Sequence, residues 1–191
     1  MARDLPIRQG LAGLEAAVEG HAGLPPVERW NPPYCGDSGM RIASDGTWFH
    51  QGALITRPAL VRLFSTILRK DDDGFMLVTP VEKLSIAVED APFVAVLMEA
   101  GGKGVDMRLT FTTNVGDKVT AGPDHALRFT PDAKTGAPIP YLHVRKGLEA
   151  KLARPVYYAM VELAVTRDGD FGVWSDGVYF VMGQNIMSQS P

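Results

Sequence analysis

The feature that most constrains the fold of this 191-residue chain is an internal repeat. The first copy contains, in order, Arg41-Ile42, Asp45-Gly46, Trp48-Phe49-His50, Gly52, Arg57-Pro58, Asp73-Gly74 and Phe75. The second copy contains Arg128-Phe129, Asp132 with Gly136, Tyr141-Leu142-His143, Gly147, Arg154-Pro155, Asp168-Gly169 and Phe171. Ordered self-similarity is the sequence signature of duplication. We therefore expect residues 40–98 to superpose on residues 126–183, with His50 equivalent to His143.

Each copy combines short strands with one helix. Apolar runs bounded by turn residues predict the strands, and Arg-Pro opens a helix in each copy because proline is tolerated in the first helical turn. The apolar spacing carries the first helix to Lys70. Val156–Val165 also fits a strand by its β-branched and aromatic content, but the parallel with the first copy favours a helix. The expected class is α+β, built from duplicated β-rich roll or meander units with one main helix each.

The order of these signals predicts three segments. Ile7, Leu11, Leu14 and Val18 share one helical face, which predicts a lead-in helix within residues 1–24. An N-terminal β-rich repeat is expected over residues 25–100, and a C-terminal one over residues 101–191. Four prolines between residues 24 and 39 predict an extended segment that wraps the core, with Trp30 largely buried beneath it.

Composition restricts the classes of function. A net charge of −3 argues against a nucleic-acid-coating surface, which needs a basic excess. No stretch approaches the roughly 20 apolar residues that cross a membrane, and the first ten residues lack the apolar core of a signal peptide. Cys35 is the only cysteine, so an internal disulfide is impossible. These observations predict a cytoplasmic protein that does not enter a membrane.

The residue pattern contains no coherent catalytic set. Gly36-Asp37-Ser38-Gly39 mimics the serine loop of trypsin-like proteases, but only His21 precedes Ser38 and could serve as the base that usually comes earlier. We interpret this loop as a turn. Cys35 with His50 could form a nucleophile–base pair, although a lone cysteine is more often a small buried hydrophobe. The four histidines lack zinc-ligand spacing. No catalytic residue, metal or cofactor is therefore predicted.

Cationic residues indicate where a ligand would bind. The densest group in the chain is His143, Arg145, Lys146, Lys151 and Arg154. Arg57 is the expected repeat counterpart of Arg154, and each Arg-Pro pair precedes a helix start whose free N–H groups favour an anion. The alternative is a solvated face, or arginines that pair with Glu82, Glu89 or Glu162. The candidate ligand-binding residues are Arg57, His143, Arg154 and His50.

Several blocks of this sequence also resemble a known family. They are residues 30–36, 41–50, 57–64, 77–83 and 88–94. These blocks resemble the signatures of a proteobacterial family known only as a domain of unknown function, and the similarity spans Trp30 to Gly183. The resemblance implies a duplicated core, a C-terminal half like a pleckstrin-homology roll, and a groove between the halves that would hold a ligand. It brings no established activity.

These observations lead to three functional hypotheses. The first is a bacterial, non-enzymatic ligand-binding or regulatory (signalling) protein that recognises an anionic small molecule or a protein partner in that groove. The second is a small hydrolase acting on a phosphorylated metabolite, with Arg57, His143 and Arg154 as anion contacts. The third is a structural partner that is recognised by an exposed strand edge.

Overall fold

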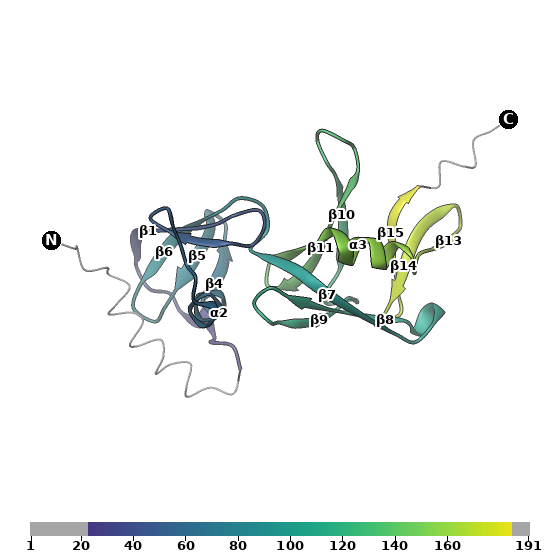
Figure 1. The fold of residues 1–191 in the computed structure, drawn as a ribbon. Helices are drawn as coiled ribbons and strands as arrows, with labels where there is room; N and C mark the ends of the chain where they lie inside the picture. The colour runs from purple at the N-terminus through teal and green to yellow at the C-terminus, as the bar shows by residue number, and fades with distance from the viewer. Residues whose placement is uncertain (1–22, 185–191) are drawn as a thin grey trace. The chain divides into compact units, whose positions relative to one another are not determined.

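The computed structural model describes residues 23–184, which form two compact units (Figure 1). The chain divides between Asp90 and Ala91 into an N-terminal and a C-terminal unit. The boundary expected after residue 100 is corrected, because it would cut strand β7 (Phe93–Gly101), which pairs only within the C-terminal unit. The lead-in helix expected in residues 1–24 lies almost entirely outside the described residues.

The N-terminal unit is one six-stranded sheet with an α-helix. Its elements are η1 (Val27–Arg29), β1 (Tyr34–Ile42), β2 (Trp48–His50), β3 (Ala53–Leu54), α2 (Pro58–Thr66), β4 (Leu68–Asp71), β5 (Gly74–Val78) and β6 (Lys83–Val88). The strand order is β3-β2-β1-β6-β5-β4, and β1 and β6 are the parallel pair in it. Met40 and Ile42 alternate toward the core, where Trp48 stacks on Phe64 of α2 with ring centroids 6.3 Å apart.

The C-terminal unit contains two sheets. Its first sheet uses β7, β8 (Arg108–Thr113), β9 (Lys118–Thr120), β10 (Leu127–Pro131), β11 (Pro138–Arg145) and β12 (Leu148–Leu152), in the order β10-β11-β12-β7-β8-β9. Its other elements are η2 (Gly104–Asp106), α3 (Arg154–Val161), β13 (Val165–Arg167), β14 (Asp170–Ser175) and β15 (Val178–Gln184). The last three strands form a separate antiparallel sheet. The β10–β11 hairpin extends beyond the rest of the unit (Figure 1).

The two six-stranded sheets have the same topology, which confirms the duplication. In each sheet two antiparallel three-stranded meanders are joined by a parallel pair between the first strand and the sixth. The chain leaves this pair in the same way in both sheets. The Glu89 N–H donates to the Ile42 carbonyl at 3.0 Å, and the Ala153 N–H donates to the Ala95 carbonyl at 3.0 Å. Strands β7–β12 are therefore the counterparts of β1–β6.

This topology corrects the residue correspondence expected from sequence. The predicted order of strands, helix and strands does recur around α3, but β10–β12 and β13–β15 belong to different sheets. Helix α2 lies between the third and fourth strands of its sheet, whereas α3 follows the sixth strand of its own. Arg57 and Arg154 are thus not equivalent, and neither are His50 and His143. Matching the two copies by the order of motifs along the chain gave the wrong correspondence, because hydrogen bonding between distant strands decides sheet topology.

Three local expectations also change. Helix α2 ends at Thr66 and not at Lys70, because residues 68–71 pair with β5 as strand β4. Residues 36–39 are not a turn but the irregular middle of β1, where its register against β6 shifts. The choice of a helix over Val156–Val165 is confirmed up to Val161, and β13 begins at Val165.

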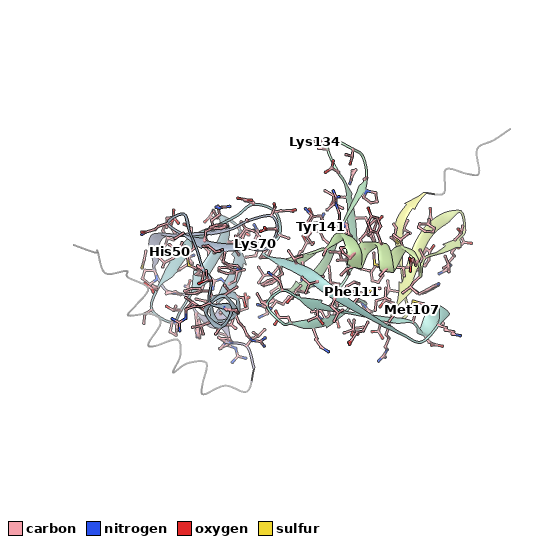
Figure 2. The ribbon with its side chains drawn as sticks, viewed as in Figure 1. His50, Lys70, Met107, Phe111, Lys134 and Tyr141 are labelled. Carbon is pink, nitrogen blue, oxygen red and sulfur yellow. The ribbon has the colours of Figure 1, made fainter. Side chains whose placement is uncertain are left out.

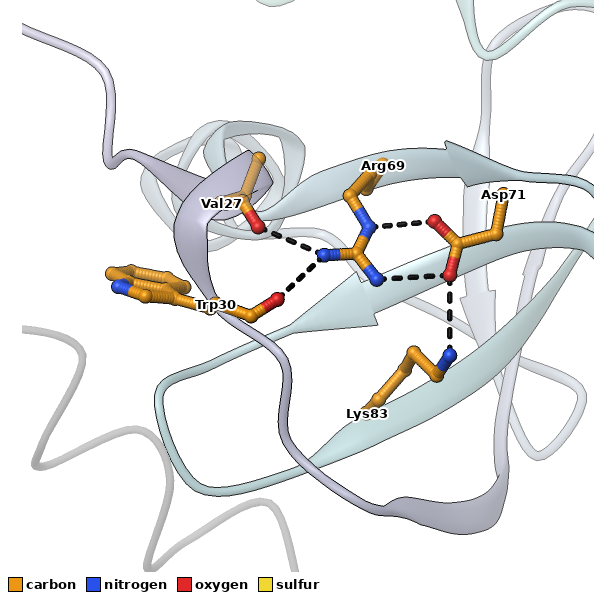
Figure 3. A network of polar contacts seen from close by, with 5 residues as sticks. All are labelled: Val27, Trp30, Arg69, Asp71 and Lys83. Atoms are coloured by element: carbon orange, nitrogen blue, oxygen red, sulfur yellow. Dashed lines mark hydrogen bonds and ion pairs between the residues drawn. The ribbon is translucent and has the colours of Figure 1, made fainter.

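An ion-pair network fastens the segment before β1 to the sheet (Figure 3). The Arg69 guanidinium donates to the carbonyls of Val27 and Trp30 at 2.9 and 2.8 Å, and it binds Asp71 at 2.6 and 2.9 Å. Lys83 Nζ lies 3.2 Å from the same carboxylate. Trp30 was expected to be largely buried, but it is half-buried, and Val27 is the buried side chain here. The segment is therefore held mainly by its backbone carbonyls.

We predict that Asp71→Asn destabilises the protein by about 1.5–3 kcal/mol at neutral pH, because it removes charge-assisted hydrogen bonds. The hydrogen bonds from Arg69, and secondarily Lys83, hold the pKa of Asp71 below its ordinary 3.8. A lowered folded-state pKa gives stability that is fully present above pH 3.8 and is lost as the pH falls through the folded-state value. Urea denaturation should therefore show the difference from wild type shrinking in acid. Asp72→Asn, an exposed neighbour, is the control, and an equal effect of both variants would contradict the prediction.

Ser175 joins the two sheets of the C-terminal unit. Its fully buried hydroxyl accepts from the Leu109 N–H at 2.9 Å and donates to the Ala121 carbonyl at 2.7 Å. The next residue continues the junction, because the Asp176 N–H donates to the Met107 carbonyl at 2.8 Å. One hydroxyl thus satisfies two backbone groups at the ends of β8 and β9.

We predict that Ser175→Ala costs about 1–3 kcal/mol for each backbone group left without a partner. Urea denaturation followed by tryptophan fluorescence would measure the change in the free energy of unfolding. Ser44→Ala, in an exposed loop of the N-terminal unit, is the matched control and should change little. A Ser175→Ala midpoint equal to that of the control would show that the hydroxyl does not hold the sheets together.

Candidate functional site

The four residues selected from sequence are divided between the two units. His50 ends β2 and Arg57 precedes α2 in the N-terminal unit, whereas His143 lies in β11 and Arg154 begins α3 in the C-terminal unit. His50 and Arg57 therefore belong to one compact unit, and His143 and Arg154 belong to the other.

His143 is a structural residue of the β11–β12 turn. Its Nε2 accepts a hydrogen bond from the Gly147 N–H at 3.2 Å, so that nitrogen carries no proton. Its Nδ1 then donates to the Asp124 carbonyl at 3.0 Å, and its ring stacks on His125 with centroids 6.0 Å apart. Both ring nitrogens are satisfied by backbone groups, which leaves His143 no free polar atom for a ligand.

The cationic group around His143 does not converge on one site. His143 pairs with Glu149, and Arg154 comes five residues later, which puts the two about 16 Å apart along the extended chain. Arg145 lies over the Phe93 ring and binds Asp117 at 2.6 Å. Arg154 itself is exposed, and its side chain forms no ion pair or hydrogen bond within residues 23–184. Arg154 is thus an isolated surface cation.

The N-terminal unit does bring two of the selected residues into one local structure, which we call the β3 corner. It consists of His50, Ala53, Leu54, Thr56 and Arg57. A two-residue turn joins β2 to β3, with φ of 48° at Gln51 and 81° at Gly52. Two successive left-handed residues are what a type I′ hairpin turn requires. This turn sets His50 opposite Ala53, and the chain then runs directly to Arg57 and α2.

His50 lies between two neighbours in the sheet. It pairs with Met40 on one side and Ala53 on the other, and its side chain is half-buried. Its Nε2 atom is buried and has no hydrogen-bond partner among the described residues. Unlike His143, His50 therefore keeps an unsatisfied ring nitrogen.

The outer edge of β3 presents unpaired backbone groups. The Ile55 N–H donates to the Trp48 carbonyl at 2.9 Å, so Trp48 and Ile55 form a hydrogen-bonded pair. Antiparallel pairs alternate, so Leu54, opposite Phe49, directs its N–H and carbonyl away from β2. Sequence reasoning missed this edge because β3 has only two residues, although Gln51-Gly52 was a usable turn signal.

Arg57 supplies an uncompensated charge beside this edge. Its side chain is exposed and makes no ion pair or hydrogen bond with any other residue of the described chain. Glu89, one of its expected partners, instead pairs with Arg41 and accepts from the Ser44 N–H at 3.0 Å. Within residues 23–184, Arg57 therefore forms no salt bridge that would fasten one part of the fold to another.

The other sequence candidates have structural roles or stand alone. The Ser38 hydroxyl donates to the Ser85 carbonyl at 2.7 Å and accepts from the Met40 N–H, so it braces the irregular part of β1. Cys35 is exposed and contacts the Pro33 carbonyl. Residues 23–184 contain no group of three or more His, Cys, Asp or Glu that could hold a metal ion.

A membrane-spanning helix is also absent from this part of the chain: none of its helices has the length and apolar character needed.

Comparisons with known proteins agree with the division of the chain. Residues 25–91 match the N-terminal domain, and residues 92–182 the C-terminal domain, of a family described as a protein of unknown function, DUF1285. A DUF1285 family protein from Silicibacter pomeroyi is 50% identical, with a TM-score of 0.85 over 96% of this chain and 97% of the other. One from Shewanella baltica is 29% identical, with a TM-score of 0.52 over 65% of this chain and 91% of the other.

No curated protein matches the chain. The two family models meet between residues 91 and 92, beside the division that the structure shows between residues 90 and 91. Together they cover most of the chain. The chain therefore belongs to the DUF1285 family.

Proposed function

We propose that this protein is a non-enzymatic binding protein that recognises an anionic group, a carboxylate or a phosphate, through Arg57 at the β3 corner. The observation that carries the proposal is the exposed Arg57 guanidinium, which has no ion pair within the described chain. Most other arginines whose contacts are described bind a carboxylate: Arg41, Arg69, Arg128, Arg145 and Arg167 are examples. Arg57 is thus available to a carboxylate or phosphate from outside.

The chemistry of arginine supports an oxyanion partner. Its planar fork of N–H donors matches carboxylate and phosphate, and such pairs form two parallel hydrogen bonds. One charge-assisted hydrogen bond contributes about 1.5–3 kcal/mol. Such an exposed contact is screened by salt, so binding should weaken as the ionic strength rises.

The hydrolase hypothesis finds less support than binding. It required Arg57, His143 and Arg154 to act as joint anion contacts. His143 is hydrogen-bonded at both ring nitrogens, and it lies far from Arg154 along β12. A binding role that begins at Arg57 needs neither of these residues.

The test is a thermal-shift titration of the full chain with inorganic phosphate, ATP and a short poly-glutamate peptide. A ligand that binds the folded state raises the melting temperature, and we expect at least one of these anions to do so. Arg57→Gln should keep the unliganded melting temperature and lose the shift, because the side chain makes no ion pair or hydrogen bond within residues 23–184. The phosphate and peptide arms distinguish a small-molecule anion from a protein carboxylate.

Lys134→Gln is the matched control, because Lys134 is an exposed cation at the tip of the β10–β11 hairpin (Figure 2). It should leave the shift unchanged. Arg154→Gln tests whether Arg154, an isolated arginine of the C-terminal unit, contributes. The proposal fails if no anion shifts the wild-type protein, or if Arg57→Gln and Lys134→Gln reduce the shift equally.

A further inference from the structure

We propose that the anionic group belongs to an extended acidic segment of a partner protein, which adds to the N-terminal sheet as a further β-strand beside β3. This inference rests on the proposed role of Arg57 and names the kind of partner that the site would take. Three features of the β3 corner carry it. They are the outward backbone groups of Leu54, the lack of a charge or a proline within β3, and the side chains that face an added strand.

The edge of β3 offers one backbone donor and one backbone acceptor. The Leu54 N–H and carbonyl point away from β2, and neither bonds to another described residue. An extended peptide that adds to a sheet edge gains its affinity from such main-chain groups. The geometry is already formed, because the type I′ turn at residues 51–52 fixes β3 against β2.

The other edges of the two sheets carry devices that discourage strand addition. Charged side chains and prolines are two of these devices. The counterpart of β3 in the second sheet is β9, and it begins with Lys118, which pairs with Glu99. The projecting part of the β10–β11 hairpin contains Pro131, Pro138 and Pro140, which have no backbone N–H to donate to an added strand.

Edge strand β4 is likewise protected by its own charges. It carries Arg69 and Asp71, and Arg69 binds the carbonyls of the η1 segment. Strand β3 consists of Ala53 and Leu54, with neither a charge nor a proline. Of the two edges of this sheet, β3 is therefore the one whose strand carries neither a charge nor a proline.

The side chains at this edge define the chemistry of the partner. Arg41, Phe49 and Leu54 lie in one cross-strand row, with the Arg41 guanidinium over the Phe49 ring and Leu54 54% exposed. An apolar side chain on an added strand would extend this row beside Leu54, because directly opposed pairs stabilise sheets. Arg57 follows three residues later and would meet an acidic side chain of the same segment. The expected motif is an apolar residue with an acidic residue two or three positions away.

The experiment begins with a phage-displayed library of eight-residue peptides panned against the full chain. We expect enrichment of extended, apolar-acidic sequences. The best sequence, made as a labelled peptide, is then titrated by fluorescence anisotropy against wild type, Leu54→Pro and Arg57→Gln. Leu54→Pro removes the outward N–H while proline remains compatible with an edge strand. We expect it to weaken binding roughly tenfold or more, from the lost hydrogen bond and the altered edge.

Two controls separate strand addition from other modes of binding. Lys118→Pro places proline at the first residue of the corresponding edge strand β9 and should leave affinity unchanged. A peptide methylated at alternate backbone nitrogens should lose affinity for the wild-type protein, which tests the hydrogen bonds even if Leu54→Pro folds poorly.

A peptide that still binds Leu54→Pro, or that tolerates methylation at either register, overturns strand addition. If that peptide still requires Arg57, the proposed function stands without it. Failure of the library to enrich such sequences also overturns strand addition, whereas the thermal shifts with anions are judged separately.

Discussion

The parallel pairing of the first and sixth strands is the interaction on which each unit depends. A three-stranded meander has only a small face to bury, and joining two of them gives a six-stranded sheet that covers a larger core. In the N-terminal unit β1 and β6 make this join, and in the C-terminal unit β7 and β12 make it. Both joins end with a hydrogen bond of 3.0 Å from the residue after the sixth strand. The buried side chains of β1 and β7, such as Ile42 and Phe93, lie at these joins.

This join also determines which strand edges remain open. Since the first and sixth strands pair in the middle, the third and fourth become the outer edges of each sheet. Three of these four edges carry charges or prolines that limit pairing: β4 has Arg69 and Asp71, β9 has Lys118, and β10 has Pro131. The fourth, β3, has only Ala53 and Leu54. The same topology that stabilises the N-terminal unit therefore leaves one edge without a charge or a proline, and Arg57 follows three residues after that strand ends.

Local signals in the sequence predicted local structure well, and long-range pairing poorly. Arg-Pro correctly predicted the starts of α2 and α3. The same Arg-Pro signal suggested that Arg57 and Arg154 are equivalent, which is wrong because a helix start carries no information about the strands around it. The apolar spacing around Leu68 also fitted a helix, and only pairing with Leu77 makes it a strand. Of the predicted site, Arg57 and His50 share one corner, whereas no sequence signal showed that His143 is bound to backbone groups.

The contrast between His50 and His143 shows where a binding site should be sought in a duplicated fold. A side chain that is fully hydrogen-bonded inside the shared scaffold, like His143, is explained by the stability of its own turn. The β3 corner differs, because the His50 Nε2, the Leu54 backbone and the Arg57 guanidinium all lack partners within the described chain. These groups lie where the two copies differ: α2 joins the third and fourth strands of the first sheet, whereas a short non-helical connection joins them in the second. The scaffold common to both copies does not require Arg57 at this point, and residues 23–184 supply it with no carboxylate, so the β3 corner is where a binding partner should be sought.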